Sequence, residues 1–325
     1  MRILITGGAG FLGRKLAQEL LRRGALSVKG TGPRSISKLI LFDKYAATGL
    51  PGDERLTIVE GDIRDAGALR ALLAPPPDII FHLAAVVSGE AEKDFDLGMQ
   101  VNLHATMALL EICRALEAAP VLVFASSCAV FGGELTETIY DHTAPAPRSS
   151  YGMQKAVGDL LISDYSRRGF IDGRILRLPT IVVRPGKPNA ATSSFASSII
   201  REPLQGRRAT CPVGPETKVW VLSPRKVTQN FIHAAELPPE RLGQQRVINL
   251  PGITVTVAEM VAALEAVGGK DLSARIDWAP DPFIQSIVLT WPPNFAPERA
   301  LELGFQRDGS FEEVIEVFRE EDMGG

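Results

Sequence analysis

Short apolar segments alternate with longer amphipathic segments through the first half of the chain. The short segments carry Val, Ile, Leu or Phe at successive positions, which is typical of strands that helices cover on both faces. The longer segments repeat their apolar residues with helical spacing. We expect strands at residues 3–6, 39–43, 56–62, 78–85, 121–127 and 174–182, and helices at residues 14–23, 66–74, 95–118 and 151–168.

This alternation of strand and helix predicts an α/β fold built on a parallel sheet. Parallel neighbours need a long crossover, and a helix that packs back on the sheet supplies it. We therefore expect residues 1–183 to form a doubly wound domain with helices on both faces. Residues 25–38 interrupt the pattern, because they are longer than a usual helix-to-strand connection, and we expect a surface loop there.

The second half of the chain has a weaker pattern. Pro, Gly and Ser cluster in residues 185–198, which predicts a loop. A helix expected at residues 257–267 begins with Thr256 and Glu259 at the spacing of a capping box, and another is expected at residues 311–320. We expect residues 184–325 to form mainly a smaller α/β lobe, with part of the chain returning to the main sheet.

Composition excludes several classes of protein. The chain has 325 residues, of which 45% are hydrophobic and 22% charged, with a formal net charge of -3, and no basic cluster suggests nucleic-acid binding. Its three cysteines are too few and too scattered for a disulfide framework or a zinc site, so we expect no metal. No targeting segment and no apolar run of about 18 residues stand out. We expect a cytoplasmic protein that binds no membrane.

A glycine-rich loop follows the first expected strand and leads into the first helix. Residues 6–13 read TGGAGFLG, and Gly7, Gly10 and Gly13 permit a tight turn and close approach of the backbone to a pyrophosphate. The beginning of the helix offers free N–H groups and a positive dipole end to the phosphates. The loop therefore predicts a dinucleotide site.

Asp43 ends the second expected strand. A carboxylate at this position accepts hydrogen bonds from ribose hydroxyls and repels a 2′-phosphate, which favours NAD over NADP. Asp43 lies 30 residues after Gly13, further than usual, and the insertion at residues 25–38 accounts for the excess. The alternative is that Asp43 only forms a turn.

Ser127, Tyr151 and Lys155 form a candidate catalytic set. Tyr151 and Lys155 lie four residues apart on one face of an expected helix, and Ser127 ends the strand before it. Ligands of an open α/β sheet bind beyond the carboxyl ends of its strands, so the three side chains should meet there. Oxidation of an alcohol requires a base for the hydroxyl proton, and a nearby Lys cation favours the Tyr phenolate.

Together these motifs resemble the extended short-chain dehydrogenases/reductases, the NAD-dependent epimerase/dehydratase family. The resemblance covers the first 185 residues, includes HLAA at residues 82–85, and implies a Rossmann fold that binds NAD. It also implies that Ser127, Tyr151 and Lys155 are catalytic. The residues that it places at the cofactor are Gly7, Gly10, Phe11, Leu12, Gly13, Asp43, Asp62, Ile63, Ala84, Asn102, Tyr151, Lys155 and Pro179.

Residues 82–90, 178–189 and 223–224 are similar to a branch of the family that acts on small sugar acids. That similarity implies NAD-dependent oxidation at C2 of a four-carbon sugar acid. Nucleotide-sugar branches usually carry a hydrophobic-His-x-Asp-Asp segment in the second half. Here residues 231–235 read FIHAA, without either Asp, which disfavours a nucleotide-sugar substrate.

A sugar acid needs a cation for its carboxylate and polar groups for its hydroxyls. Arg184 or Arg225 could hold the carboxylate with two parallel hydrogen bonds, although each could also be a solvated surface residue. Short polar loop residues are usually turn formers, but some of them could bind hydroxyls. The candidate hydroxyl partners are Ser88, Ser127, Asn189 and Ser193.

Two other functions stay open at this point. A nucleotide-sugar epimerase or dehydratase would use the same Ser, Tyr and Lys on a larger substrate. A regulator that senses dinucleotide without catalysis would not need Tyr151 or Lys155. By analogy with the family we expect a homodimer formed through the helix at residues 95–118 and the Tyr151 helix, whose apolar residues could otherwise serve ordinary core packing.

Overall fold

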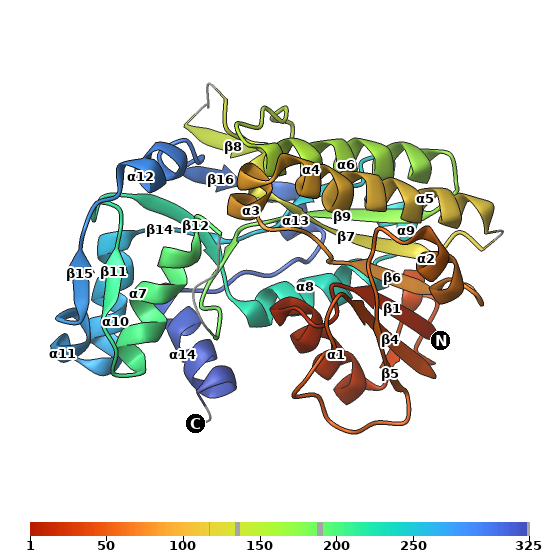
Figure 1. Cartoon of the computed structure of the whole chain (residues 1–325), viewed down its shortest axis with the longest axis horizontal. Helices are drawn as coiled ribbons and strands as arrows, with labels where there is room; N and C mark the ends of the chain where they lie inside the picture. The colour runs from red at the N-terminus through yellow and green to blue at the C-terminus, as the bar shows by residue number, and fades with distance from the viewer. Residues whose placement is uncertain (117, 134–136, 187–190, 324–325) are drawn as a thin grey trace.

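The computed structural model describes residues 1–116, 118–133, 137–186 and 191–323. Its centre is a parallel seven-stranded sheet in the order β13-β9-β7-β6-β1-β4-β5 (Figure 1). The chain order reverses between β1 and β6, which is where a doubly wound sheet binds its ligand. The strands are β1 (Arg2–Thr6), β4 (Lys38–Asp43), β5 (Leu56–Glu60), β6 (Ile79–His82), β7 (Val121–Ser127), β9 (Asp172–Leu178) and β13 (Val247–Asn249).

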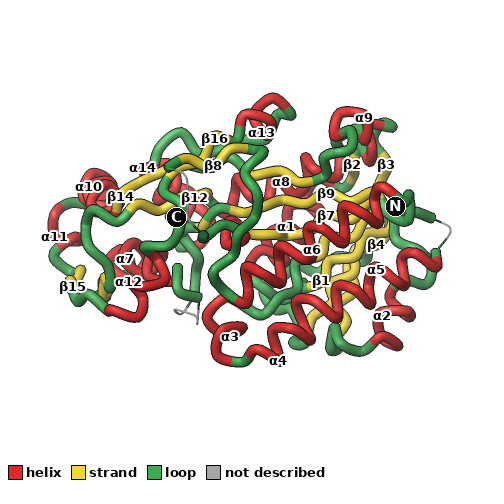
Figure 2. The backbone as a smooth tube through the Cα atoms, turned by 90° about the horizontal axis from the view of Figure 1, so that it is seen from above, coloured by secondary structure: helices red, strands yellow, loops and turns green. Residues whose placement is uncertain are grey.

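Successive residues of the central strands face opposite layers of helices. Ile3 and Ile5 of β1 belong to one hydrophobic core, whereas Leu4 belongs to another on the other face. Full burial of such a side chain stabilises the fold by about 1.5–3 kcal/mol, so both faces hold the sheet in place. One face is covered by α1 (Phe11–Arg23) and α8 (Pro224–Glu236), and the other by α2 (Ala66–Leu72), α5 (Ala105–Ala115) and α6 (Ser150–Arg167). Figure 2 shows α5 and α6 side by side.

The two layers against the main sheet together form the main core, and a second hydrophobic core lies in the C-terminal lobe, between three helices and the mixed sheet β10-β12-β14. Thr256 and Glu259 form the expected capping box at the beginning of α10, with each backbone N–H donating to the other side chain. The core elements are α7 (Ser194–Leu204), α10 (Val257–Gly268), α14 (Phe311–Asp322), β10 (Thr180–Ile181), β12 (Lys218–Leu222) and β14 (Ile253–Thr256).

Shorter elements complete the fold. β8 (Thr138–Tyr140) pairs with β16 (Asn294–Ala296), and β11 (Ala209–Cys211) pairs with β15 (Ile276–Trp278). The remaining helices are α3 (Ser88–Lys93), α4 (Phe95–Gly98), α9 (Pro239–Leu242), α11 (Lys270–Ser273), α12 (Pro282–Val288) and α13 (Glu298–Glu302). Within the described residues, no helix combines the length and apolar character that crossing a bilayer requires.

The structure corrects several expected elements. The strand expected at residues 174–182 is wrong, because Pro179 separates β9 in the main sheet from β10 in the second sheet. Proline lacks the N–H that a ladder needs, so the strand ends before it. The helix expected at residues 95–118 is interrupted by a π-helical segment, Met99–His104, between α4 and α5.

Two expected loops contain regular structure. Residues 185–198 were expected as a loop, but α7 begins at Ser194 because Phe195, Ile199 and Ile200 form an apolar face buried in the second core. The loop expected at residues 25–38 contains the hairpin of β2 (Ala25–Leu26) and β3 (Arg34–Ser35). Its apolar residues Leu26 and Val28 are buried in the main core, so the insertion packs against the domain.

Candidate active site

The glycine loop between β1 and α1 leaves no room for side chains. A Cβ atom on Gly13 would lie 2.3 Å from the Gly7 carbonyl oxygen, and one on Gly7 would lie 2.7 Å from the Ala84 nitrogen. Gly7 has a φ of +73°, which favours glycine. Gly10 precedes α1 and provides no side-chain cap, so the first-turn N–H groups of the helix are available to an anion. The loop fits a dinucleotide pyrophosphate.

Asp43 stands at the end of β4 beside this loop. Its Oδ2 accepts a hydrogen bond from the Ala9 N–H at 3.1 Å, which fixes the carboxylate at the edge of the expected cofactor site. At the end of the next strand, Arg64 donates hydrogen bonds to Asp62 and lowers the pKa of that carboxyl to about 2. Ile63 beside it is buried. The ends of β4 and β5 therefore form one edge of the site.

Buried hydrogen bonds link the strand beside the glycine loop to the Tyr151 helix. The buried His82 ring contacts the hydroxyls of Thr6 at 2.7 Å and of Thr106 at 2.9 Å. The Asn102 amide contacts both backbone groups of Val86 and donates to Gln154 Oε1 at 2.7 Å. Asn102 thus holds α6 against the segment after β6.

Ser127, Tyr151 and Lys155 meet at the carboxyl end of β7. Ser127 Oγ accepts from the Ala129 N–H at 3.1 Å, and Lys155 Nζ donates to the Ala125 carbonyl at 2.8 Å. The Lys155 Nζ lies 5.7 Å from the centre of the Tyr151 ring. Gly152 allows α6 to pack closely against the segment after β7, because a Cβ at this position would lie 2.1 Å from the Ala129 oxygen.

Burial dominates the electrostatics of this group. It raises the pKa of Tyr151 to about 12, and the positive charge of Arg184 opposes that rise. Burial lowers the pKa of Lys155 to about 8, and the negative charge of Asp159 opposes that fall. Tyr151 therefore needs additional positive charge to become a base near neutral pH.

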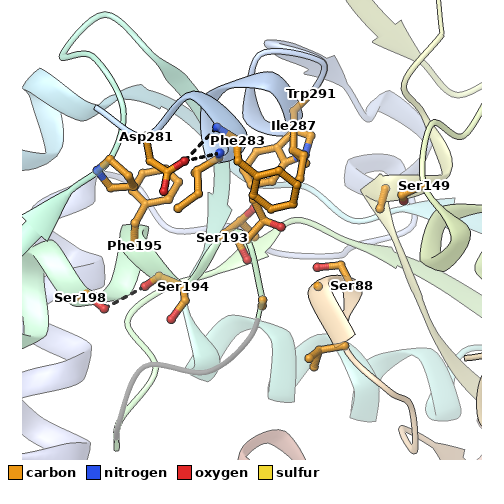
Figure 3. Close-up of a pocket in the computed structure, with 18 of the residues that line it drawn as sticks. Ser88, Ser149, Ser193, Ser194, Phe195, Ser198, Asp281, Phe283, Ile287 and Trp291 are labelled. Atoms are coloured by element: carbon orange, nitrogen blue, oxygen red, sulfur yellow. Dashed lines mark hydrogen bonds between the residues drawn. The ribbon is translucent and has the colours of Figure 1, made fainter. Parts of the chain in front are cut away.

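Ser127 and Tyr151 open into a cavity of about 1340 Å³ between the main sheet and the C-terminal lobe. Figure 3 shows Phe283, Ile287 and Trp291 on one side of the cavity, with Ser88 and Ser149 across from Ser193 and Ser194. The walls therefore combine apolar side chains with hydroxyl groups, as a small-molecule site requires.

Some of the residues expected to bind the substrate line this cavity, and others do not. Arg184, Ser88, Ser193 and Pro179 line the cavity with Tyr151. The Arg184 Nε donates to the Ile181 carbonyl at 3.0 Å, and no acidic partner for Arg184 occurs among the described residues.

Arg225 does not line this cavity. It lies on α8, where Glu320 and Glu321 each accept a hydrogen bond from its guanidinium at 2.6 Å. Because these two acids occupy the guanidinium, the candidate role of Arg225 as a carboxylate ligand is not supported. Asn189 lies outside the described residues.

Sequence reasoning missed Arg148 and Lys93, which also line the cavity. Neither forms an ion pair within the part of the chain that the structure describes. Arg148 directly precedes Ser149, whose hydroxyl caps α6 by accepting from the Gly152 N–H. The position of Arg148 in the sequence, next to the residue that caps the Tyr151 helix, could have marked it as a cation near the site.

The loop, the strand-end carboxylate and the Ser–Tyr–Lys group on one parallel sheet define an oxidoreductase of the short-chain dehydrogenase type. The chain belongs to the NAD dependent epimerase/dehydratase family, whose family model matches residues 3–237. It is an oxidoreductase that acts on CH–OH groups of small molecules with NAD as cofactor.

Two curated relatives match nearly the whole chain. D-erythronate dehydrogenase of Cupriavidus necator is 56% identical over 99% of this chain and 98% of its own length. D-erythronate dehydrogenase of Haemophilus influenzae is 47% identical over 99% of this chain and 100% of its own length. A solved structure described as a nucleoside-diphosphate-sugar epimerase from Agrobacterium tumefaciens is 43% identical, with a TM-score of 0.94, and the match covers 100% of this chain and 95% of that one.

Proposed function

We propose that this protein oxidises the C2 hydroxyl of a small sugar acid, converting D-erythronate to 2-oxo-D-erythronate with NAD. The observation that carries the proposal is Arg184, a cation without an acidic partner among the described residues, in the same cavity as Tyr151. An acid substrate would supply the missing carboxylate. The full-length match to two D-erythronate dehydrogenases supports the choice of acid.

Tyr151 acts as the base in this proposal. The substrate hydroxyl proton passes to the Tyr151 phenolate oxygen as the C2–H bond breaks with its electron pair and the C2=O bond forms. NAD supplies the acceptor for the hydride that leaves C2. Ser127 holds the reacting oxygen by a hydrogen bond, and the positive charge of Lys155 favours the phenolate.

The chain's own residues would hold the cofactor along the carboxyl ends of the strands. The glycine loop receives the pyrophosphate, Asp43 the adenosine ribose, and Asp62 with Ile63 the adenine. Ala84 and Pro179 line the nicotinamide end, where Lys155 also binds the ribose. The Asn102 amide is bonded to Val86 and Gln154, so we assign it to shaping the site.

Arg184 would bind the substrate carboxylate, since its Nε is fixed on Ile181 and its guanidinium has no acidic partner among the described residues, which leaves it able to form a bidentate contact. Ser88 and Ser193 are the described candidates for the remaining hydroxyls, because both line the cavity. This arrangement would place the C2 hydroxyl between Ser127 and Tyr151 while the carboxylate points toward the C-terminal lobe.

A second candidate function is nucleotide-sugar epimerase or dehydratase. Its support is the cavity of about 1340 Å³, which is larger than the roughly 300–1,000 Å³ of ordinary small-molecule pockets. The description of the Agrobacterium structure as an epimerase also favours it. The absence of an Asp pair in residues 231–235 disfavours it.

A substrate panel separates the two functions. Purified protein with NAD is offered D-erythronate, its C2 and C3 epimers, longer aldonates and uronates, and NADH absorbance is followed. UDP-glucose and UDP-galactose are tested for interconversion in a coupled assay. NADH formation highest with D-erythronate supports the proposal. No NADH with any acid, together with interconversion of the nucleotide sugars, would overturn it in favour of the second function.

We also propose a homodimer formed by α5 and α6. Phe95, Met107 and Leu160 on this side of the molecule are exposed, with Leu160 71% accessible in the single chain. A second copy would cover them. Sedimentation equilibrium tests this: a dimer is expected, and a monomer at micromolar concentration would contradict it. The cytoplasmic location expected from the sequence stays a prediction.

A further inference from the structure

The face of α6 that carries the catalytic residues continues one turn beyond them. Tyr151, Lys155 and Asp159 are spaced four residues apart, which places them along one side of the helix. Lys155 is 2% exposed and Asp159 is 1% exposed. A buried carboxylate therefore follows a buried ammonium on the helix that carries the expected base.

The buried Lys155 ammonium has little hydrogen bonding to replace the hydration that burial removes. Its one hydrogen bond among the described residues is to the Ala125 carbonyl, although an ammonium has three donors. It also lies 4.6 Å from the centre of the Phe124 ring, a cation–π contact that favours the ammonium. Burial nevertheless lowers the pKa of Lys155, and the negative charge of Asp159 opposes that fall.

The groups around Lys155 come from four elements. Tyr151 and Asp159 lie on α6, Ala125 on β7, and Arg177 on β9. His82 on β6 has its pKa lowered to about 3 by burial and by the charge of Lys155, so it is neutral at working pH. Apart from the Tyr151 phenolate, Asp159 is the titratable group among these whose charge favours the Lys155 ammonium.

Arg177 fixes the Asp159 carboxylate. The Arg177 Nε donates to Asp159 Oδ2 at 2.8 Å, and its guanidinium lies 5.0 Å from the centre of the Phe131 ring at the cavity wall. Burial raises the pKa of Asp159, and the guanidinium opposes that rise. A buried ion pair of this kind is often no more stable than a well-packed apolar pair, so stability alone does not explain it.

We infer that Asp159 is a positioning residue for the reaction, which keeps the Lys155 ammonium charged beneath Tyr151, while Arg177 keeps Asp159 ionised. The inference rests on the proposed role of Lys155 in favouring the Tyr151 phenolate. Charges then alternate from Arg177 through Asp159 and Lys155 to the phenolate. Loss of the Asp159 charge should make Lys155 lose its proton at lower pH.

Asp159→Asn tests this through the pH profile of kcat/KM. The neutral amide removes the charge that opposes burial, so the Lys155 pKa falls below about 8 and the alkaline limb moves to lower pH. A fall of about one unit would reduce kcat/KM about tenfold at about pH 9 and by less than about 1.5-fold at about pH 6. Asp159→Glu, which restores the charge, should return the limb toward the original position.

Two controls separate this role from a structural one. Asp164→Asn removes an exposed carboxylate of the same helix, which pairs with Arg167, and should leave the profile unchanged. The double variant Asp159→Asn with Arg177→Met removes the buried pair together. If Asp159 serves only to neutralise Arg177, the double variant regains the original profile. If the inference is correct, the profile stays shifted.

The titration of Lys155 in the protein without cofactor provides a test that does not depend on the substrate. Lysine side-chain NMR signals are followed with pH, and Lys155→Met identifies the signal. Asp159→Asn should lower the observed pKa of Lys155, and it should weaken NADH binding at alkaline pH. An unchanged Lys155 titration would overturn the inference, even if D-erythronate proves to be the substrate. A lowered pKa would support it even if the substrate is different.

Discussion

The two sides of the active site are built from different kinds of structure. On the cofactor side, Ser127 and Lys155 extend from a parallel strand and a long helix whose neighbours are buried and hydrogen-bonded. On the substrate side, the cavity wall comes from α7, the seven-residue α12 and connecting segments, and Phe283 is 65% exposed. Under the proposed function, the reacting groups lie on a buried sheet and helix, whereas substrate selectivity depends on a more exposed wall built from loops and short helices.

Among the variants that test the difference between the two sides, removal of the Tyr151 hydroxyl should cause the largest loss of activity. Tyr151→Phe keeps the ring but removes the proton acceptor, so kcat should fall about 10²- to 10⁴-fold. The dissociation constant of NADH, measured by fluorescence, should change little, because the glycine loop is intact. Tyr140→Phe, at an exposed tyrosine, is the matched control. A variant that retained most of its kcat would show that Tyr151 is not the base.

Loss of the Arg184 cation should weaken substrate binding, and it should also raise the Tyr151 pKa further, because the Arg184 charge opposes that rise. Arg184→Gln removes a charged contact with the carboxylate worth about 1.5–3 kcal/mol, so kcat/KM should fall about 10- to 150-fold. NADH affinity should stay the same. Arg225→Gln is the control, since its guanidinium is paired with Glu320 and Glu321 away from the cavity. Equal losses in both variants would remove Arg184 from the proposed substrate site.

A substitution in the glycine loop should affect the cofactor side and weaken NADH binding. Gly13→Ala places a Cβ 2.3 Å from the Gly7 oxygen, and the resulting strain of about 1–3 kcal/mol should weaken NADH binding about 5- to 150-fold. Gly52→Ala is the control, because no atom lies within 4 Å of its added Cβ. Isothermal titration with NADH measures both. Unchanged affinity in Gly13→Ala would mean that the loop does not hold the pyrophosphate.

The smallest expected effect concerns the acid stability of the sheet. Burial lowers the folded-state pKa of His82 to about 3, so the unfolded chain takes up a proton first as the pH falls below about 6.5. His82 should therefore cost about 2 kcal/mol of unfolding free energy between about pH 7 and about pH 5.

Urea unfolding at the two pH values measures this cost. His82→Gln keeps a donor and an acceptor without titrating, so it should lose that part of the acid sensitivity even if it is less stable at neutral pH. His104→Gln replaces an exposed histidine and serves as the control. The same pH dependence in His82→Gln and the unsubstituted protein would contradict the prediction.

The sequence was most informative where the local pattern of residues is enough to determine which side chains meet in the folded chain. β7 matches its expected range, and Ser127, Tyr151 and Lys155 meet because strand ends and helix beginnings of a parallel sheet share one edge. The break at Pro179 was missed because the apolar pattern continues from one sheet into the next.

The substrate wall was harder to predict for a physical reason. α12 lies more than 130 residues after Tyr151 in the chain, and nothing in its local pattern reveals that it faces the same cavity. α7 was hidden by a serine-rich segment whose apolar face becomes evident only against the second core. Asp159 is an ordinary helix residue in sequence, and its importance depends on Arg177 reaching it from β9.

The passage of the chain through Pro179, from one sheet directly into the next, has a consequence for evolution and protein engineering. The residues to which we assign hydride transfer, Ser127, Tyr151 and Lys155, precede this point, and most of the cavity wall follows it. We therefore expect that substitutions within residues 191–212 and 279–292 can change the substrate preference while the proposed catalytic residues stay the same. Libraries confined to those two segments are the economical route to a dehydrogenase for another hydroxy acid.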